Sequence, residues 1–152
     1  MGNIFNEDFR EFIEWLNKEE VEYMLAGGYS VILHGYSRTT GDMDIWVNVT
    51  RENLVKLQNA CAGFGLPTEE LTEHNFLKND NIDVFTYGQP PVSIDIMKKV
   101  KGLSFTEAYK EAVSFQVENV KIRVISRKDL MKAKKASNRP KDQDDIEQLA
   151  GE

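Results

Sequence analysis

The chain has 152 residues, a length that suits one domain with a hydrophobic core of its own. Hydrophobic residues make up 41% and charged residues 29%, as in ordinary globular proteins, and the single cysteine, Cys61, excludes a disulfide framework and a thiolate metal cluster. The N-terminus carries no apolar signal segment, and no stretch approaches the ~18 apolar residues of a membrane span. We therefore expect a cytoplasmic protein with no membrane association.

Charge is distributed unevenly along the chain. The net charge is -6, which argues against a general polyanion-binding protein. Residues 1–97 carry 6 basic and 16 acidic side chains, whereas residues 98–152 carry 13 basic and 9 acidic ones. Nine of the basic residues fall within 121–141, beside a single acid, Asp129. This basic segment is either a solvated helix face or a surface that binds phosphate while carboxylates elsewhere bind metal.

The first half of the chain predicts helices and strands in alternation. Apolar residues from Phe9 to Leu16 have the i, i+3, i+4, i+7 spacing of an amphipathic helix. Apolar residues alternate with others over 21–25 and 42–48, as in strands, and Thr50 is placed to cap a following helix. The expected elements are a helix around 9–16, a strand over 21–25 that ends at Gly27-Gly28, a short helix over 30–34, a strand over 42–48 and a helix after Thr50.

The second half predicts further strands, a hairpin and C-terminal helices. Ser104 with Glu107 forms the pattern of a capping box, and Ser126 with Asp129 marks another helix start. The expected elements are strands over 82–87 and 92–97, a helix after Ser104, a hairpin over 115–125 that turns at Glu118-Asn119, a helix over 126–136 and a last helix after a break at 138–140. This order predicts a mixed α/β or α+β fold, with a small mixed sheet flanked by helices.

We expect a single domain over residues 1–152, with the C-terminal helices of 126–150 packed on it, because the sequence contains no linker, repeat or low-complexity stretch. It also contains no Walker loop and no dinucleotide-binding fingerprint.

Two carboxylates stand two positions apart in the strand over 42–48. Side chains at i and i+2 of a strand project to one face, so Asp42 and Asp44 lie side by side while Met43 and Ile45 face the core. Carboxylates this close repel each other in the absence of a cation, and Mg²⁺ prefers such oxygen ligands together with substrate phosphates. The alternative is a pair of exposed acids that guards an edge strand against aggregation.

A double glycine, Gly27-Gly28, follows the first predicted strand. Without side chains, these residues let the backbone approach a ligand closely. Ser30, at the start of the next helix, adds a hydroxyl and backbone N–H groups that suit a phosphate. The alternative is a simple tight turn.

A third carboxylate, Asp95, is the lone acid in the otherwise apolar strand over 92–97. If this strand lies beside the strand over 42–48, Asp95 reaches the aspartate pair, since neighbouring strands are about 5 Å apart. A buried carboxylate without a partner is costly, and a shared metal removes that cost. Asp83 has similar apolar neighbours, so the strand pattern alone leaves both acids as candidates.

Together these motifs resemble the signature of the DNA polymerase β-like nucleotidyltransferase superfamily. The resemblance begins with Gly27-Gly28-Tyr29-Ser30 and Asp42-Met43-Asp44-Ile45, and it is closest to small bacterial members, kin to toxin-type and minimal nucleotidyltransferases. The segments 93–97, 102–109 and 130–146 continue it, so that it covers residues 21–50 and 90–149. Members carry their third carboxylate on a later strand, which favours Asp95 over Asp83.

The resemblance implies a nucleotidyltransferase fold and a metal-dependent reaction. A nucleoside monophosphate would move from a nucleoside triphosphate to an acceptor hydroxyl, with release of pyrophosphate. Two Mg²⁺ ions would be held by Asp42, Asp44 and Asp95, and Asp95 would also deprotonate or orient the acceptor hydroxyl. The glycine motif, with Gly27, Gly28 and Ser30, would hold β- or γ-phosphate oxygens.

Arg38 and Lys134 are further candidates for nucleotide binding. Arg38 either contacts phosphate or forms a plain ion pair with the nearby acids. Lys134 occupies the place of a family lysine that faces the triphosphate, with Lys132 and Lys135 as exposed alternatives. His34 is expected to hydrogen-bond locally rather than to bind metal.

Three functions are compatible with these residues. The first is an active enzyme whose acceptor is a small molecule, an RNA end or a protein hydroxyl. The second is a non-catalytic module that binds a nucleotide or a partner, and the third is a toxin-type enzyme controlled by a cognate protein. Because all three carboxylates are present, the first is favoured. A chain of this length leaves little room for an acceptor domain, so we expect a homo-oligomer or a partner protein to complete the site.

Overall fold

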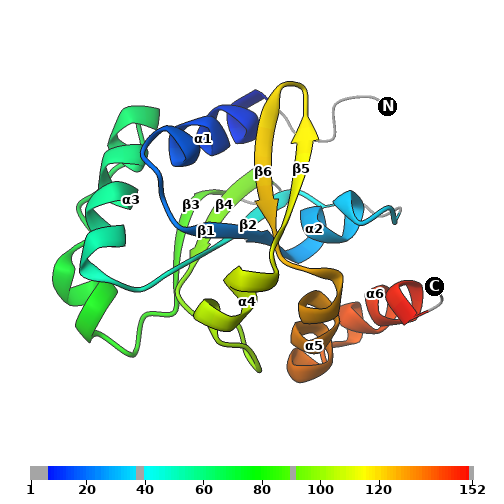
Figure 1. Ribbon diagram of the computed structural model, residues 1–152. Helices are drawn as coiled ribbons and strands as arrows, with labels where there is room; N and C mark the ends of the chain where they lie inside the picture. The colour runs from blue at the N-terminus through cyan, green and yellow to red at the C-terminus, as the bar shows by residue number, and fades with distance from the viewer. Residues whose placement is uncertain (1–6, 37–39, 90–91, 151–152) are drawn as a thin grey trace.

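The computed structural model describes residues 7–36, 40–89 and 92–150, which form one six-stranded sheet with helices around it (Figure 1). The strands are β1 (Tyr23–Ala26), β2 (Asp42–Val47), β3 (Val84–Gln89), β4 (Val92–Met97), β5 (Val113–Val117) and β6 (Val120–Val124). The helices are α1 (Glu7–Lys18), α2 (Gly27–Leu33), α3 (Arg51–Phe64), the π-helix η1 (His74–Lys78), α4 (Phe105–Glu111), α5 (Arg127–Ser137) and α6 (Pro140–Ala150).

The sheet is mixed, with the strand order β3-β4-β2-β1-β6-β5. The pairs β2–β4 and β1–β6 are parallel, and the other three pairs are antiparallel. Strands from both halves of the chain therefore meet at its centre, where β1 and β2 lie between β4 and β6. This confirms the mixed sheet flanked by helices that the sequence predicts.

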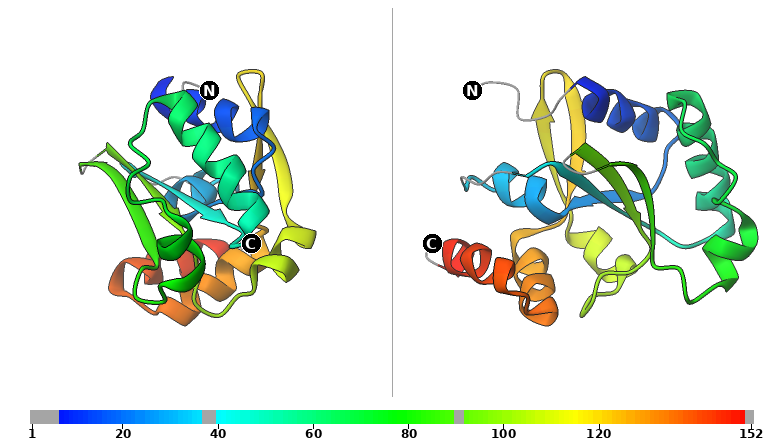
Figure 2. Two further views of the ribbon diagram at one scale, coloured as in Figure 1. Left: turned by 90° about the vertical axis from the view of Figure 1, so that its left-hand side faces the viewer. Right: turned by 180° about the vertical axis from the view of Figure 1, so that it is seen from behind.

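Helices pack against each other on different sides of the sheet (Figure 2). Helix α1 packs on α3 and on β6, and the rings of Phe12 and Phe64 meet edge to face at 5.3 Å. Helices α5 and α6 pack side by side below the sheet in the view of Figure 1, whereas α1 lies above it. Helix α5 also contacts α2, which follows β1 directly.

The core follows the predicted periodicities. In α1, Phe9, Phe12, Ile13 and Leu16 are buried, as are all four side chains of β1. In β2, Met43 and Ile45 are fully buried, which leaves the two aspartates on the other face. Trp46 is also buried and packs against the Phe105 ring at 5.2 Å.

Several predicted boundaries and caps are confirmed. Thr50 accepts a hydrogen bond from the Asn53 amide at the start of α3, and Ser126 accepts one from the Asp129 amide at the start of α5. The hairpin turns at Glu118 and Asn119, both at positive φ. The primed turn that this geometry indicates matches the twist of the paired strands.

Other predicted details are wrong. Helix α2 begins at Gly27, not at Ser30, since a left-handed φ of 63° at Gly27 turns the chain directly from β1 into the helix. Ser104 makes no side-chain capping bond, so the expected capping box does not form. Strand β3 continues to Gln89, beyond the predicted end at residue 87, because Gly88 pairs with Ser93 on β4. Among the described residues, no helix is both long and apolar enough to cross a membrane.

Candidate active site

The three aspartates singled out from the sequence lie on adjacent parallel strands. In the β2–β4 register, Asp44 stands directly opposite Asp95, and Asp42 stands opposite Ser93. Asp44 is also paired with Ala26 on the other side, where β1 ends. The carboxylates therefore gather beside the turn from β1 into α2.

A cavity of about 400 Å³ opens between these carboxylates and the C-terminal helices. Asp42, Asp44 and Asp95 line one side of it. The basic residues that line it come from the β4–α4 connection, α5 and the start of α6: Lys99, Lys101, Lys134, Arg139 and Lys141. A cavity with carboxylates on one side and several cationic groups on the other suits an anion that is bound together with a cation.

Asp83, the rival acid, lies at the edge of the same cavity but away from the other carboxylates. It precedes β3, its side chain is 63% exposed, and it pairs with Lys99 at 3.8 Å. The register thus brings Asp95, and not Asp83, into line with Asp44.

Gly27 is in direct contact with the central carboxylate. A Cβ atom at this position would lie 1.9 Å from Oδ2 of Asp44, and the residue has φ of 63°. Both the close approach and the left-handed backbone require glycine. The backbone of Gly27 forms part of the cavity wall beside Asp44.

Ser30 is placed differently from the expectation of a direct phosphate contact. Its side chain is fully buried, and its hydroxyl donates to the Gly27 carbonyl at 2.6 Å. Gly28 is buried as well. In this arrangement Ser30 secures the first turn of α2, and it supports the Gly27 turn rather than facing the cavity. Arg38 lies outside the described residues.

Burial, together with the neighbouring carboxylates, raises the pKa of Asp44 to about 6. The largest cause is burial, followed by the neighbouring carboxylates of Asp95 and Asp42, while Lys134 acts in the opposite direction. One oxygen of Asp95, Oδ1, is buried without a hydrogen-bond partner. An unpaired buried carboxylate oxygen and a repelled neighbour are both relieved by a bound cation.

The donor set therefore fits Mg²⁺, which takes carboxylate oxygens and keeps other positions for water and phosphate. Within the described part of the chain, however, no three acidic, histidine or cysteine side chains are already grouped as metal ligands. Binding of a metal by Asp42, Asp44 and Asp95 together would require their side chains to rotate toward a common point.

Ser93 is a site residue that the sequence did not reveal. Its hydroxyl donates to Oδ1 of Asp42 at 2.8 Å, and the residue is only 3% exposed. The bond depends on the β2–β4 register, because Ser93 and Asp42 are 51 positions apart in the chain. It holds one oxygen of Asp42 and leaves the other for a ligand.

Lys134 is buried among acids from the last helix. It is 6% exposed, and its ammonium lies 3.4 Å from Asp142 and 3.1 Å from Asp145, which are buried too. Lys132 and Lys135, the alternatives on the same helix, are exposed. Helical phase therefore turns Lys134 alone of these three toward the cavity.

Asp142 contacts both Lys134 and Arg139. It accepts bonds from the backbone and side chain of Arg139, the closest at 2.8 Å. Burial raises the pKa of Asp142, but the hydrogen bonds from Arg139 and the charge of Lys134 outweigh it and lower the pKa to about 2. Asp142 thus stays ionised and fixes Lys134 and Arg139 at the start of α6, in addition to the expected capping role.

His34 is used structurally. Its ring nitrogen Nε2 donates a hydrogen bond to the carbonyl of Ile125 at 2.8 Å, and its ring meets Phe115 edge to face. This agrees with the expectation of a hydrogen-bonded rather than a metal-binding histidine.

Comparisons with known proteins agree with this fold. A crystal structure of a candidate nucleotidyltransferase from Thermotoga maritima superposes with a TM-score of 0.57 at 15% identity, over 94% of this chain and 90% of that one. This likeness shows a shared nucleotidyltransferase fold. No curated protein matches the sequence. Residues 6–150 match a family described as a nucleotidyltransferase of unknown function, DUF6036. The chain belongs to this family of small nucleotidyltransferases.

Proposed function

We propose that the protein is a magnesium-dependent nucleotidyltransferase that moves a nucleoside monophosphate from a nucleoside triphosphate, with ATP the first donor to test, to an acceptor hydroxyl in the cytoplasm. The observation that carries this proposal is the alignment of Asp42, Asp44 and Asp95 on neighbouring parallel strands, across one cavity from Lys134 and Arg139.

Asp42, Asp44 and Asp95 would hold the magnesium ions, which supply neutralising charge for the triphosphate when they are bound. On the other side of the cavity, Lys134 and Arg139 bind phosphate oxygens, together with the exposed Lys141. Gly27 lets the ligand approach the backbone beside Asp44, since no side chain stands there.

The chemical step forms a bond between the acceptor oxygen and the α-phosphorus and breaks the bond from that phosphorus to the bridging oxygen. Asp95 accepts the hydroxyl proton, and pyrophosphate leaves with the bridging oxygen. The unpaired Oδ1 of Asp95 is an available acceptor for that proton. Most of the catalytic effect comes from positioning and charge stabilisation, because the protein forms no covalent intermediate.

The test is calorimetric binding of each nucleoside triphosphate with and without Mg²⁺, followed by an assay for pyrophosphate release. Wild type should bind one triphosphate in a magnesium-dependent manner, and Asp44→Asn should lose that binding while it remains folded. Asp83→Asn is the matched control, because Asp83 lines the same cavity from an exposed position. The proposal fails if wild type binds no triphosphate, or if Asp83→Asn loses as much binding as Asp44→Asn.

A further inference from the structure

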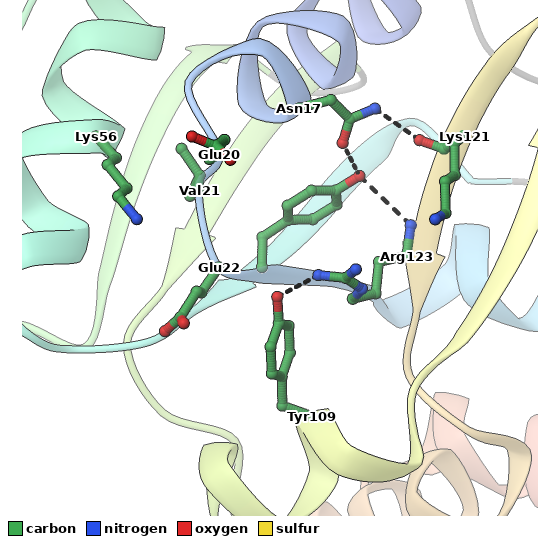
Figure 3. Close-up of a pocket in the computed structure, with 9 residues that line it drawn as sticks. Asn17, Glu20, Val21, Glu22, Lys56, Tyr109, Lys121 and Arg123 are labelled. Atoms are coloured by element: carbon green, nitrogen blue, oxygen red, sulfur yellow. Dashed lines mark hydrogen bonds between the residues drawn. The ribbon is translucent and has the colours of Figure 1, made fainter.

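A second cleft, of about 440 Å³, lies at the opposite end of β1 from Gly27 (Figure 3). It is built from the end of α1, the turn into β1, and residues of α3, α4 and β6. Among its lining residues are none that line the cavity of the three aspartates. It is therefore a separate candidate binding site.

One side of this cleft is cationic. Lys121 and Arg123 stand two positions apart on β6 and so share a face, whereas Lys56, on α3, lies across the cleft from them, on the side of Glu20 and Glu22. None of these three makes an ion pair with another described residue. Lys121 and Arg123, two neighbouring cations on one strand face, form a site for an anion with more than one negative charge.

Arg123 is held in place for such a ligand. Its guanidinium lies 4.8 Å from the centre of the Tyr109 ring and donates one hydrogen bond to the Tyr109 hydroxyl. The guanidinium still has other N–H donors, which can form paired bonds to a phosphate. Because Tyr109 already fixes the guanidinium, little conformational entropy is lost on binding.

The base of the cleft is rigid. The hydroxyl of Tyr23 donates to Oδ1 of Asn17 at 2.9 Å, and Nδ2 of Asn17 donates to the Lys121 carbonyl at 2.7 Å. These bonds join α1, β1 and β6, and they satisfy the polar groups beneath the cleft. The cleft is thus preformed.

The other side of the cleft carries two carboxylates, Glu20 and Glu22. Glu20 has φ of 58° at the end of α1, where the Glu20 and Val21 amides bond back to Asn17 and Leu16. The same motif ends α3, but there Gly65 occupies the left-handed position. The chain therefore keeps a carboxylate at the cleft in a backbone conformation that favours glycine.

We propose that this cleft binds a small phosphate ester that carries hydroxyl groups, such as a sugar phosphate. Lys121 and Arg123 hold the phosphate dianion. Glu20 and Glu22 accept hydrogen bonds from the hydroxyls on the side of the cleft where Lys56 lies, and Glu22 already accepts a bond from the Asn48 side chain. The two cations on β6 suit a phosphate dianion, and the two carboxylates oppose a ligand that is anionic throughout. This site is independent of the nucleotidyltransferase reaction proposed above.

The test is calorimetric titration of the full chain with ribose 5-phosphate. Wild type should bind it saturably, and Lys121→Gln and Arg123→Gln should each weaken binding at least tenfold. Lys121 is exposed, so its substitution leaves the fold intact, and the melting temperature reports whether Arg123→Gln stays folded. Lys110→Gln, an exposed change on α4 away from the cleft, should bind as wild type does.

Three further measurements separate the parts of the proposal. Glu20→Gly should raise the melting temperature, because glycine relieves the backbone, and yet weaken ribose 5-phosphate binding. Inorganic phosphate should bind at least tenfold more weakly than ribose 5-phosphate. Asp44→Asn should leave ribose 5-phosphate binding unchanged, which separates this site from the catalytic one.

The proposal is overturned if wild type does not bind ribose 5-phosphate. It is also overturned if Lys121→Gln and Arg123→Gln bind as tightly as Lys110→Gln, or if Asp44→Asn abolishes binding. Equal affinity for inorganic phosphate would show that the hydroxyl groups of the ester are not recognised. Saturable binding of the free amino acid glycine, in place of ribose 5-phosphate, would show that the cleft takes a small zwitterion and not a hydroxylated phosphate ester.

Discussion

Asp44 on β2 stands directly opposite Asp95 on β4, and the backbone of Gly27 lies against the carboxylate of Asp44. Two partly buried acids in this position oppose folding when both are ionised. Such a cost to stability is usual where acids serve binding, as the metal site proposed above requires.

Asp44→Asn should therefore stabilise the protein while it abolishes activity. The raised pKa of Asp44, about 6 against a reference of 3.8, corresponds to a penalty of about 3 kcal/mol at neutral pH. Removal of the charge should recover part of it, seen as a higher midpoint in urea unfolding at pH 7.5 without metal. A lower midpoint than wild type would contradict this account of the pair.

The same pKa sets the pH dependence of the metal-free protein. Because the folded-state pKa of Asp44 is raised, its favourable contribution is complete below pH 3.8 and is lost as pH rises through about 6. The free energy of unfolding should therefore carry a falling component between about pH 4 and 6 in wild type. This component should be absent from Asp44→Asn, and Mg²⁺ at pH 7.5 should restore stability to wild type only.

Gly27→Ala should be strongly destabilising and inactive. The added methyl group would meet Oδ2 of Asp44 at 1.9 Å, and alanine also resists φ of 63°. We expect a loss of 2 to 4 kcal/mol, that is about 1 for the backbone and the rest for displacement of a packed strand. Chemical denaturation provides the measurement.

Gly35→Ala is its matched control. Gly35 has φ of 104°, but a Cβ there would meet nothing within 4 Å. This variant isolates the backbone cost, which should be about 1 kcal/mol. If both variants lose the same stability, the contact between Gly27 and Asp44 does not restrict the site.

Much of the site was predictable because strand periodicity is local information. The alternation of Asp42 and Asp44 with buried Met43 and Ile45 assigns the acids to one face without any tertiary structure. The choice of Asp95 over Asp83 was not local: it depends on the parallel pairing of β2 with β4, and the family resemblance, not the strand pattern, favoured Asp95.

What escaped prediction depends on contacts between distant segments. The bond from Ser93 to Asp42 exists only through strand register, and the partners of Lys134 lie on a different helix. The π-helix over His74–Lys78 is another example, because Lys98, from the end of β4, donates to the carbonyls of Asn75 and Asn79 within and beyond it. Propensity scales carry no such information.

Asp142→Asn should lower the stability of the protein, because Asp142 holds Lys134 and Arg139 on the cationic side of the cavity. Asp142 is fully buried and receives bonds from Arg139 and the charge of Lys134, so loss of its charge should cost about 3 to 5 kcal/mol. Its pKa of about 2 is lowered from 3.8, so its contribution is complete above pH 3.8 and is lost as pH falls through 2. Acid titrations should show less loss of stability in this region for the variant than for wild type.

Lys134→Gln should show whether triphosphate binding needs the ammonium of Lys134 itself or only the overall positive charge of α5. With Lys134 neutralised, the buried Asp142 and Asp145 lose a shared cation, and a triphosphate loses a charged contact in the cavity. We expect at least a tenfold loss of affinity, about 1.4 kcal/mol, for the triphosphate with Mg²⁺, together with a lower melting temperature.

Lys132→Gln tests whether that loss is specific. Lys132 lies on the same helix, carries the same charge and is exposed, so its substitution should change neither melting temperature nor triphosphate affinity beyond a small, salt-sensitive effect. Calorimetry of both variants at two ionic strengths makes the comparison. Equal losses for Lys132→Gln and Lys134→Gln would mean that α5 attracts the triphosphate only by its overall charge, and that the burial of Lys134 serves the packing of α5 on α6.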